Sequence, residues 1–227
     1  LTRLQTINLG ANQLTGSIPT ELGNLVNLQS LSLHSNQLTG NIPATIGNLS
    51  NLQFLSLVQN KLNSSIPPEL GNLTHLQTLN LVANQLTGNI PPEFGKLVNL
   101  QTLDLGINHI RSVPKDIARL TRLKKLCLNS NHTPPLDTRH LWQQIAVFEQ
   151  LETLALWSCQ AKMEIPEEIA ALKKLKSLDV DNNKITKLPE SLATMVWLQK
   201  LRISTNPLPE NEAERLQAAL PHTKVMG

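Results

Sequence analysis

Leucines recur along the chain at a nearly constant spacing. The steps between the leucines that open successive units are 24, 24, 24, 24, 23, 28, 24 and 23 residues. Those leucines are Leu4, Leu28, Leu52, Leu76, Leu100, Leu123, Leu151, Leu175 and Leu198. The alternation of apolar and polar positions after each predicts a short strand with one buried face. One unit cannot bury that face alone, so the pattern predicts a stack of about nine repeats around one continuous core.

Each unit follows a close version of L-x-x-L-x-L-x-x-N, as in LQSLSLHSN at 28–36 and LQTLNLVAN at 76–84. This pattern resembles that of leucine-rich repeat proteins and covers essentially the whole chain. The resemblance implies an α/β solenoid, a right-handed horseshoe or superhelix. It further implies a parallel β-sheet on the concave face and helical, 3-10 or extended segments on the convex face. In this family the concave face usually binds the partner.

The repeats come in two styles within one predicted domain, 1–227. In the first four units the motif LTGSIP at 14–19 returns as LTGNIP, LNSSIP and LTGNIP, which resembles the plant-type repeats of receptor-kinase ectodomains and polygalacturonase-inhibiting proteins. That type implies an added short strand after the main one, and we expect later units to abandon it. The predicted parts are plant-type repeats (1–108), mixed repeats resembling shorter bacterial or cytosolic ones (109–206), and a C-terminal cap (207–227). Because residue 1 falls inside a repeat, we expect a fragment of a longer chain.

The asparagine that ends each motif lies where the strand turns away from the sheet. Its side-chain amide can satisfy loop backbone groups that would otherwise be buried without a partner. Cys159 takes this position in the seventh unit. The sequence therefore predicts a ladder formed by Asn12, Asn36, Asn60, Asn84, Asn108, Asn131, Asn183 and Asn206.

The segment 132–150 interrupts the repeat. Residues 131 and 151 are 20 positions apart, whereas residues 12 and 28 of an undisturbed unit are 16 apart. After two prolines, Asp137 or Thr138 can cap a helix whose inward stripe is Leu141, Ile145 and Phe148. We expect this helix on the convex side, and an exposed Trp142 would indicate a second contact surface.

The end of the chain, NPLPENEAERLQAALP, reads as a cap that covers the last hydrophobic layer. We expect its prolines to form a turn and a helix to follow. The residues that we expect to face inward are Ala213, Leu216, Ala219 and Leu220.

Charge and hydropathy exclude two classes of partner. The net charge is +3, and residues 1–108 hold only seven charged side chains, a net of −1, so the remainder carries +4. We see in neither half a concentrated basic stripe with interleaved aromatics, and therefore expect no nucleic acid partner. No apolar run approaches the roughly 18 residues needed to cross a bilayer, so no membrane insertion is expected in this segment.

Most outward strand positions are small and neutral, so the exceptions predict contact with a partner. Trp and Arg are the types that most often dominate interface energy. Asp179 and Arg202, expected to face each other on adjacent strands, also fit a structural ion pair, and that alternative stays open. The predicted contact residues are Phe54, Val58 and Val82, which form an apolar spot, together with Asp104, Trp157, Asp179, Asp181, Lys200 and Arg202.

The partial matches to catalytic motifs in this sequence lack the residues or the spacing that catalysis requires. The S-x-x-K match at Ser112–Lys115 lacks its companion motifs, and residues 88–96 have the wrong glycine spacing for a phosphate loop. The six histidines show no ligand spacing. We therefore expect no catalytic residue, no metal site and no cofactor.

The sequence favours a non-enzymatic module that recognises a protein or peptide through the concave face. Two alternatives stay open. One is the targeting or sensor region of a larger signalling enzyme, such as a receptor kinase or a bacterial effector. The other is adsorption to a regular surface, such as ice or a cell-wall polymer.

Cysteines and glycosylation motifs point to different compartments. Cys127 and Cys159 are predicted to diverge and stay unpaired, which favours a reducing compartment or a bacterial origin. Four N-x-[ST] motifs, at Asn48, Asn63, Asn72 and Asn131, favour secretion. The sequence leaves open the compartment and the oligomeric state.

Overall fold

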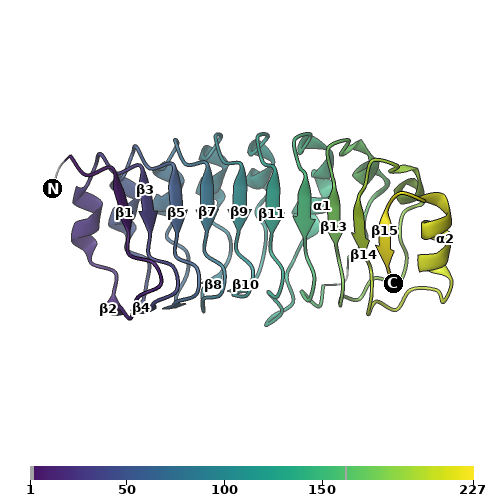
Figure 1. The fold of residues 1–227 in the computed structure, drawn as a ribbon, viewed down its shortest axis with the longest axis horizontal. Helices are drawn as coiled ribbons and strands as arrows, with labels where there is room; N and C mark the ends of the chain where they lie inside the picture. The colour runs from purple at the N-terminus through teal and green to yellow at the C-terminus, as the bar shows by residue number, and fades with distance from the viewer. Residues whose placement is uncertain (1–2, 162) are drawn as a thin grey trace.

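A computed structural model describes residues 3–161 and 163–227. Its main feature is a parallel sheet in which each strand pairs with the strand one repeat away, so the chain forms a solenoid (Figure 1). The register joins equivalent positions, as in Leu31 with Leu55. The strands, in spatial order, are β1 (Thr6–Asn8), β3 (Ser30–Ser32), β5 (Phe54–Ser56), β7 (Thr78–Asn80), β9 (Thr102–Asp104), β11 (Lys125–Cys127), β12 (Thr153–Ala155), β13 (Ser177–Asp179), β14 (Lys200–Arg202) and β15 (Lys224–Met226).

The sheet has ten strands, one more than the nine repeats predict. The tenth, β15, comes from the cap, where Lys224 pairs with Lys200 and Met226 with Arg202. The cap therefore extends the sheet as well as covering its core. The sequence did not indicate this strand because KVM carries no repeat signature.

A second line of short strands follows the turn after each of the first five main strands. It comprises β2 (Thr15–Ser17), β4 (Gln37–Gly40) and β6 (Lys61–Leu62) in one sheet and β8 (Thr87–Gly88) with β10 (His109–Ile110) in another. The expectation that units after the fourth abandon this strand is wrong for the fifth. There His109 N–H donates to Leu86 O, and Arg111 N–H to Gly88 O. Backbone pairing with the preceding repeat is enough to form the strand without the plant-type consensus.

The side opposite the main sheet is built from short 3-10 helices. Seven of them begin directly after a proline, which occupies the N-cap position in an extended conformation, as at Pro19 with φ −64° and ψ 135°. The helices are η1 (Thr20–Asn24), η2 (Ala44–Asn48), η3 (Pro68–Asn72), η4 (Pro92–Lys96), η5 (Lys115–Arg119), η6 (Ile145–Val147), η7 (Glu167–Ala171) and η8 (Glu190–Thr194). Leucine and isoleucine fill the space between them and the sheet, and Phe94 and Phe148 are the largest fully buried side chains.

The predicted asparagine ladder is present. Asn60 donates from Nδ2 to Leu33 O at 3.0 Å and Leu57 O at 3.1 Å, and its Oδ1 accepts from Leu38 N at 3.0 Å. Each of the nine ladder residues follows a residue with positive φ, a strained conformation for a side chain other than glycine. The ladder hydrogen bonds hold this tight turn in every repeat. The strained residues are Ala11, Ser35, Gln59, Ala83, Ile107, Ser130, Ser158, Asn182 and Thr205.

The segment 132–150 forms α1 (Arg139–Gln143) followed by η6, behind the main sheet (Figure 1). The predicted stripe of Leu141, Ile145 and Phe148 is buried. Asp137, rather than the Thr138 side chain, caps the helix, because Asp137 Oδ1 accepts from Arg139 N at 3.0 Å. Trp142 is only 6% exposed, so it indicates no second contact surface.

The cap helix α2 (Glu212–Ala219) buries Leu216 and Leu220, and Ala213 packs against the core. Ala219 is exposed, which corrects the prediction that it faces inward. At 100° per residue it lies on the far side of Leu216 from Ala213 and Leu220, outside the narrow buried stripe.

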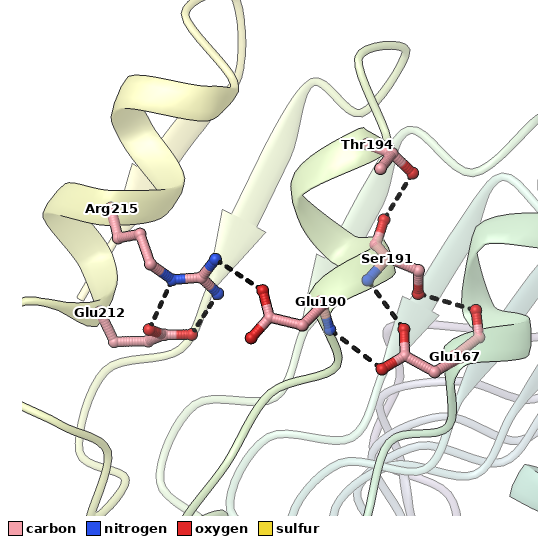
Figure 2. Close-up of polar contacts among 6 residues, drawn as sticks. All are labelled: Glu167, Glu190, Ser191, Thr194, Glu212 and Arg215. Atoms are coloured by element: carbon pink, nitrogen blue, oxygen red, sulfur yellow. Dashed lines mark hydrogen bonds and ion pairs between the residues drawn. The ribbon is translucent and has the colours of Figure 1, made fainter.

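A chain of polar contacts joins the cap to the preceding repeats (Figure 2). Arg215 bridges Glu190 at 3.1 Å and Glu212 at 2.8 Å. The Glu167 carboxylate in turn accepts from the backbone N–H groups of Glu190 and Ser191 at 3.1 and 2.8 Å. The contacts therefore run without a break from η7 through η8 to α2.

Candidate recognition face

The outward strand residues stand in columns across the main sheet, as the repeat alignment predicts. The first column runs from Thr6 through Phe54 and Lys125 to Lys200. The middle column contains Asp104, Cys127, Ala155, Asp179 and Arg202 in neighbouring strands. We call this outward surface of the ten-stranded main sheet the recognition face.

The apolar spot predicted in repeats three and four is split. Val58 and Val82 lie in adjacent repeats, where Gln59 N–H donates to Val82 O at 2.8 Å, and both are half-buried. Phe54 is 39% exposed but stands at the start of β5, four residues before Val58. Four residues of extended chain span about 13 Å, so Phe54 is not part of one patch with the valines.

Two ion pairs lie on the face, one between repeats five and six and one between repeats eight and nine. Lys125 Nζ is 2.9 Å from Asp104 Oδ2, and Arg202 Nη1 is 3.2 Å from Asp179 Oδ2. Asp104 is 7% exposed and Asp179 9%, and a carboxylate so buried requires a partner. The open alternative of a cross-strand pair between Asp179 and Arg202 is thus realised in the structure.

Lys125 was not among the sequence candidates. The sequence feature that could have identified it is its position in the first column, because the first five repeats have only Thr, Ser or Phe there. The register puts it beside Asp104, and this pairing depends on the neighbouring repeat.

Asp181 carries the least compensated carboxylate of this region. Burial, and then the charge of Asp179 two residues away, raise the pKa of Asp181 above its usual range. Its Oδ1 accepts from Ser204 N at 2.7 Å, which opposes the shift. Asp181 is therefore ready to accept a cation or a hydrogen-bond donor from a partner.

Trp157 lies half-buried between the repeats of Asn129 and Asp181. Beside it the middle column has small side chains, Cys127 and Ala155, both buried. Burial, followed by the charge of Asp104, raises the pKa of Cys127 to about 12, so its thiol stays protonated at neutral pH and is a poor nucleophile. The structure thus brings an indole, a low apolar floor and flanking carboxylates together on three repeats. Lys200 lies farther off, half-buried in the first column.

The four glycosylation motifs differ in access. Asn48, Asn63 and Asn72 are exposed. Asn131 is 0% exposed, and its amide donates to Leu105 O and Leu128 O while it accepts from Ile110 N. The prediction of Asn131 as an acceptor is therefore wrong for the folded chain, because its side chain belongs to the ladder.

The cysteines, the groups that could bind a metal and the hydropathy of the helices are three further possible sources of function. Cys127 and Cys159 are both free and buried. Within residues 3–161 and 163–227, no group of three or more His, Cys, Asp or Glu side chains is placed to hold a metal ion. In the same ranges, no helix has the length and hydropathy to span a membrane.

Three models of leucine-rich repeats match the chain. A leucine-rich repeat region model matches residues 68–163, a second leucine-rich repeat model matches 27–86, and a third matches 3–25 and 174–195. Together they cover most of the sequence and both repeat styles.

Several solved structures have the same fold. The plant peptide hormone receptor RGFR1 in complex with RGF2 is 31% identical with a TM-score of 0.81, over 91% of this chain and 33% of that chain. The Arabidopsis receptor kinase HAESA, in complex with the peptide hormone IDA and the co-receptor SERK1, is 29% identical with a TM-score of 0.76, over 91% of this chain and 39% of that chain.

Among curated proteins, a probable inactive serine/threonine-protein kinase, roco10 of Dictyostelium discoideum, is 31% identical over 104 residues. This match covers 46% of this chain and 4% of that protein. The chain thus spans about a third of the two solved receptors and a small part of the curated relative. With its repeat pattern, ten-stranded parallel sheet and asparagine ladder, the chain belongs to the leucine-rich repeat family.

Proposed function

We propose that this chain is a non-enzymatic module that binds a protein or peptide through the recognition face. The observation that carries the proposal is the contrast in side chains along one regular sheet. The first repeats present mostly small neutral residues, whereas Trp157 and Asp181 stand beside a floor of small side chains in the later ones. We place the main contact at this site, which we call the Trp157 site.

The Trp157 site has features of an interface centre. A half-buried indole offers a large contact area with few rotatable bonds. Asp181 supplies a carboxylate that the protein only partly compensates. The strands around it are held by backbone pairing on both sides, so a partner meets a preformed surface and little ordering entropy is lost.

The solved relatives support a peptide or protein as the partner class. The titles of two similar structures name complexes of receptors with the peptide hormones RGF2 and IDA. Those ligands belong to those receptors, and the identity of this chain's partner is a separate question.

A capture experiment tests the proposal. The chain is immobilised, partners are taken from an extract of the organism that makes it, and each bound protein is quantified by mass spectrometry. We expect Trp157→Ala combined with Asp181→Asn to lower capture of a specific partner at least tenfold. The matched control, Lys115→Ala with Glu168→Ala, changes two exposed residues on the 3-10 side and should leave capture unchanged.

Two outcomes would overturn the assignment. Full capture by the Trp157→Ala/Asp181→Asn variant would show that the Trp157 site is not the contact. Loss on substitution of the Thr and Ser columns of repeats one to four, with no effect of Trp157→Ala, would favour adsorption to a regular surface. Far-UV circular dichroism of each variant excludes unfolding as the cause.

The accessible glycosylation motifs at Asn48, Asn63 and Asn72 remain a prediction. Intact-mass measurement of the protein from its natural source checks it. Added sugar mass on any of the three would place the chain in the secretory route.

A further inference from the structure

One margin of the recognition face changes chemistry halfway along the molecule. The residue that precedes each main strand is glutamine in the first five repeats, at positions 5, 29, 53, 77 and 101. The same position is Lys124 in the sixth repeat and Lys176 in the eighth. These positions are stacked, since the backbone of Lys124 accepts from Glu152 N–H and the backbone of Glu152 from Lys176 N–H.

The net positive charge of the protein arises on this margin. The margin at each repeat consists of the six residues that end at the first residue of the main strand. In repeats two to five (25–30, 49–54, 73–78 and 97–102) these six residues include no Asp, Glu, Lys or Arg. The later ones (120–125, 148–153, 172–177, 195–200 and 219–224) hold eight basic and two acidic residues, a net of +6 in a chain of net +3. The basic margin comprises Arg122, Lys124, Lys125, Lys173, Lys174, Lys176, Lys200 and Lys224.

The basic margin corrects the prediction that neither half of the sequence has a concentrated basic stripe. In the linear sequence the eight residues are spread over about 100 positions. Stacking of parallel repeats brings their strands to about 4.8 Å apart, so the cations share one edge. The register places Lys125, Lys200 and Lys224 in the same column.

The protein's own carboxylates neutralise only part of the margin. Lys125 pairs with Asp104 at 2.9 Å and Lys176 with Glu152 at 2.6 Å. Around Lys176 lies a hollow of about 280 Å³, lined also by Lys173, Lys174 and Trp197. Six of the eight basic side chains, all but Lys125 and Lys200, belong to exposed residues.

We propose that the basic margin binds an acidic segment, rich in Asp and Glu, of the partner that the recognition face engages. The inference rests on the proposed function, because Lys125 and Lys200 stand on the face itself and make the two surfaces continuous. The internal pairs with Asp104 and Glu152 show that carboxylates fit among these ammonium groups.

The aromatic residue in the hollow argues against nucleic acid as the occupant. Single-stranded nucleic acids gain affinity by stacking bases on open aromatic faces. The Trp197 ring is covered on one face by Lys173 Nζ, 4.1 Å from its centroid, and its indole N–H donates to Leu172 O at 2.9 Å. Because the Trp197 ring also packs against the hydrophobic core, the hollow offers charge without an open stacking surface.

The probe is a fluorescein-labelled peptide of twelve alternating Glu and Ser residues, and binding is measured by fluorescence anisotropy. We expect binding that weakens as salt rises, because the contact is an exposed ionic one. Lys173→Glu/Lys174→Glu/Lys176→Glu should lower affinity at least tenfold. The control Lys61→Glu/Lys115→Glu/Lys187→Glu has the same change in net charge on exposed residues elsewhere and should stay within twofold of the wild type.

Three results would overturn the proposal. One is no binding of the peptide by the wild type at low salt. Another is equal loss in the margin and control variants, which would mean that net charge alone attracts the peptide. The third is tighter binding of a single-stranded DNA of equal charge, which would make nucleic acid the occupant.

The two proposals fail separately. Trp157→Ala/Asp181→Asn should leave binding of the Glu–Ser peptide unchanged, since neither residue belongs to the margin. If capture of the natural partner survives that substitution while the peptide still binds the margin, the Trp157 site is wrong and the margin stands. If the peptide fails to bind while capture depends on Trp157, the reverse holds.

Discussion

Repeats one to five and repeats six to nine share one backbone but differ in the charge that their exposed positions carry. Both halves bury most of their leucines and pair strands in the same register. The edge of the first half carries glutamine where the second carries Lys124 and Lys176. Every ion pair found within the described ranges lies between residues 104 and 215. The core therefore dictates the inward positions, while the outward ones are free to specialise.

The halves also differ in how closely their 3-10 helices stack. A Cβ built on Gly47 would lie 2.3 Å from Glu69 O of the next repeat, a contact that real Cβ atoms do not make. The equivalent position is glycine in repeats one to four and alanine at 118 in the fifth, 170 in the seventh and 193 in the eighth. The first four repeats thus depend on glycine for close approach, and these later ones do not.

The largest expected effect is on the ladder. Asn108→Ala removes donors to Leu81 O and Leu105 O and the acceptor for Leu86 N, all buried. We expect a loss of about 3 kcal/mol of unfolding free energy, since each orphaned buried group costs about 1–3 kcal/mol. Cys159→Ala in the second half, which loses only the weak sulfur contacts to Leu128 O and Trp157 O, should cost about 1 kcal/mol. Urea unfolding measures both, and equal losses would contradict the assigned role of the asparagine.

Next comes the glycine that permits close stacking. Gly47→Ala should destabilise by about 2 kcal/mol, because the repeats must separate to admit the methyl group. The reciprocal change, Ala170→Gly, creates no clash and should cost about 1 kcal/mol through chain entropy. Thermal unfolding of the two variants compares the halves directly. A neutral Gly47→Ala would mean that the first half relaxes as easily as the second.

A smaller, stabilising effect is expected at the boundary between the halves. Ile107 is an exposed β-branched residue at φ 55°, whereas the equivalent Asn182 has φ 52°. Asparagine tolerates this region better, so Ile107→Asn should stabilise by about 1 kcal/mol and Asn182→Ile should destabilise by a similar amount. Denaturant midpoints report both signs. Destabilisation by both would mean that the Ile107 side chain is held by packing.

The smallest effect is that of acid. Arg215 lowers the pKa of Glu212 below its usual 4.5, and the Ser191 N–H and then its hydroxyl lower that of Glu167. A lowered folded-state pKa gives stability that is present above the unfolded value and lost as pH falls through the folded one. The second half should therefore loosen first below about pH 4.5.

Tryptophan fluorescence can follow this, because Trp142, Trp157 and Trp197 all lie in the second half. We expect the fluorescence change to precede the loss of far-UV circular dichroism on acidification. Glu212→Gln should shift the fluorescence midpoint to higher pH at constant salt. Coincident transitions in the wild type would show that the solenoid unfolds as one unit regardless of where its ion pairs lie.

The solenoid and the columns of the recognition face could be predicted from the sequence. In a parallel sheet of stacked repeats, residues that are one repeat apart in the sequence lie side by side on neighbouring strands. Residues one period apart, such as Asp179 and Arg202, become partners, and the ladder asparagines align for the same reason. The buried stripe of α1 was readable from helical spacing.

Other features depended on where the backbone actually goes. Strand β15 carries no leucine pattern and forms because the cap returns beside β14. Phe54 and the valines share repeats but not a patch, since position along the strand separates them. Ala219 lies outside the buried stripe of its helix, and the Asn131 side chain is buried and so closed to glycosylation. Both outcomes depend on packing that local motifs do not encode.

By itself the sequence determined the repeat, the core and the facing of each strand residue, since these follow from the spacing of leucines. The tertiary structure alone decided how charges are shared and gathered. Lysines that are unremarkable in separate units become one basic margin only when about 4.8 Å of strand spacing brings them together, and the carboxylates that remain among them set how much of that charge a partner can use.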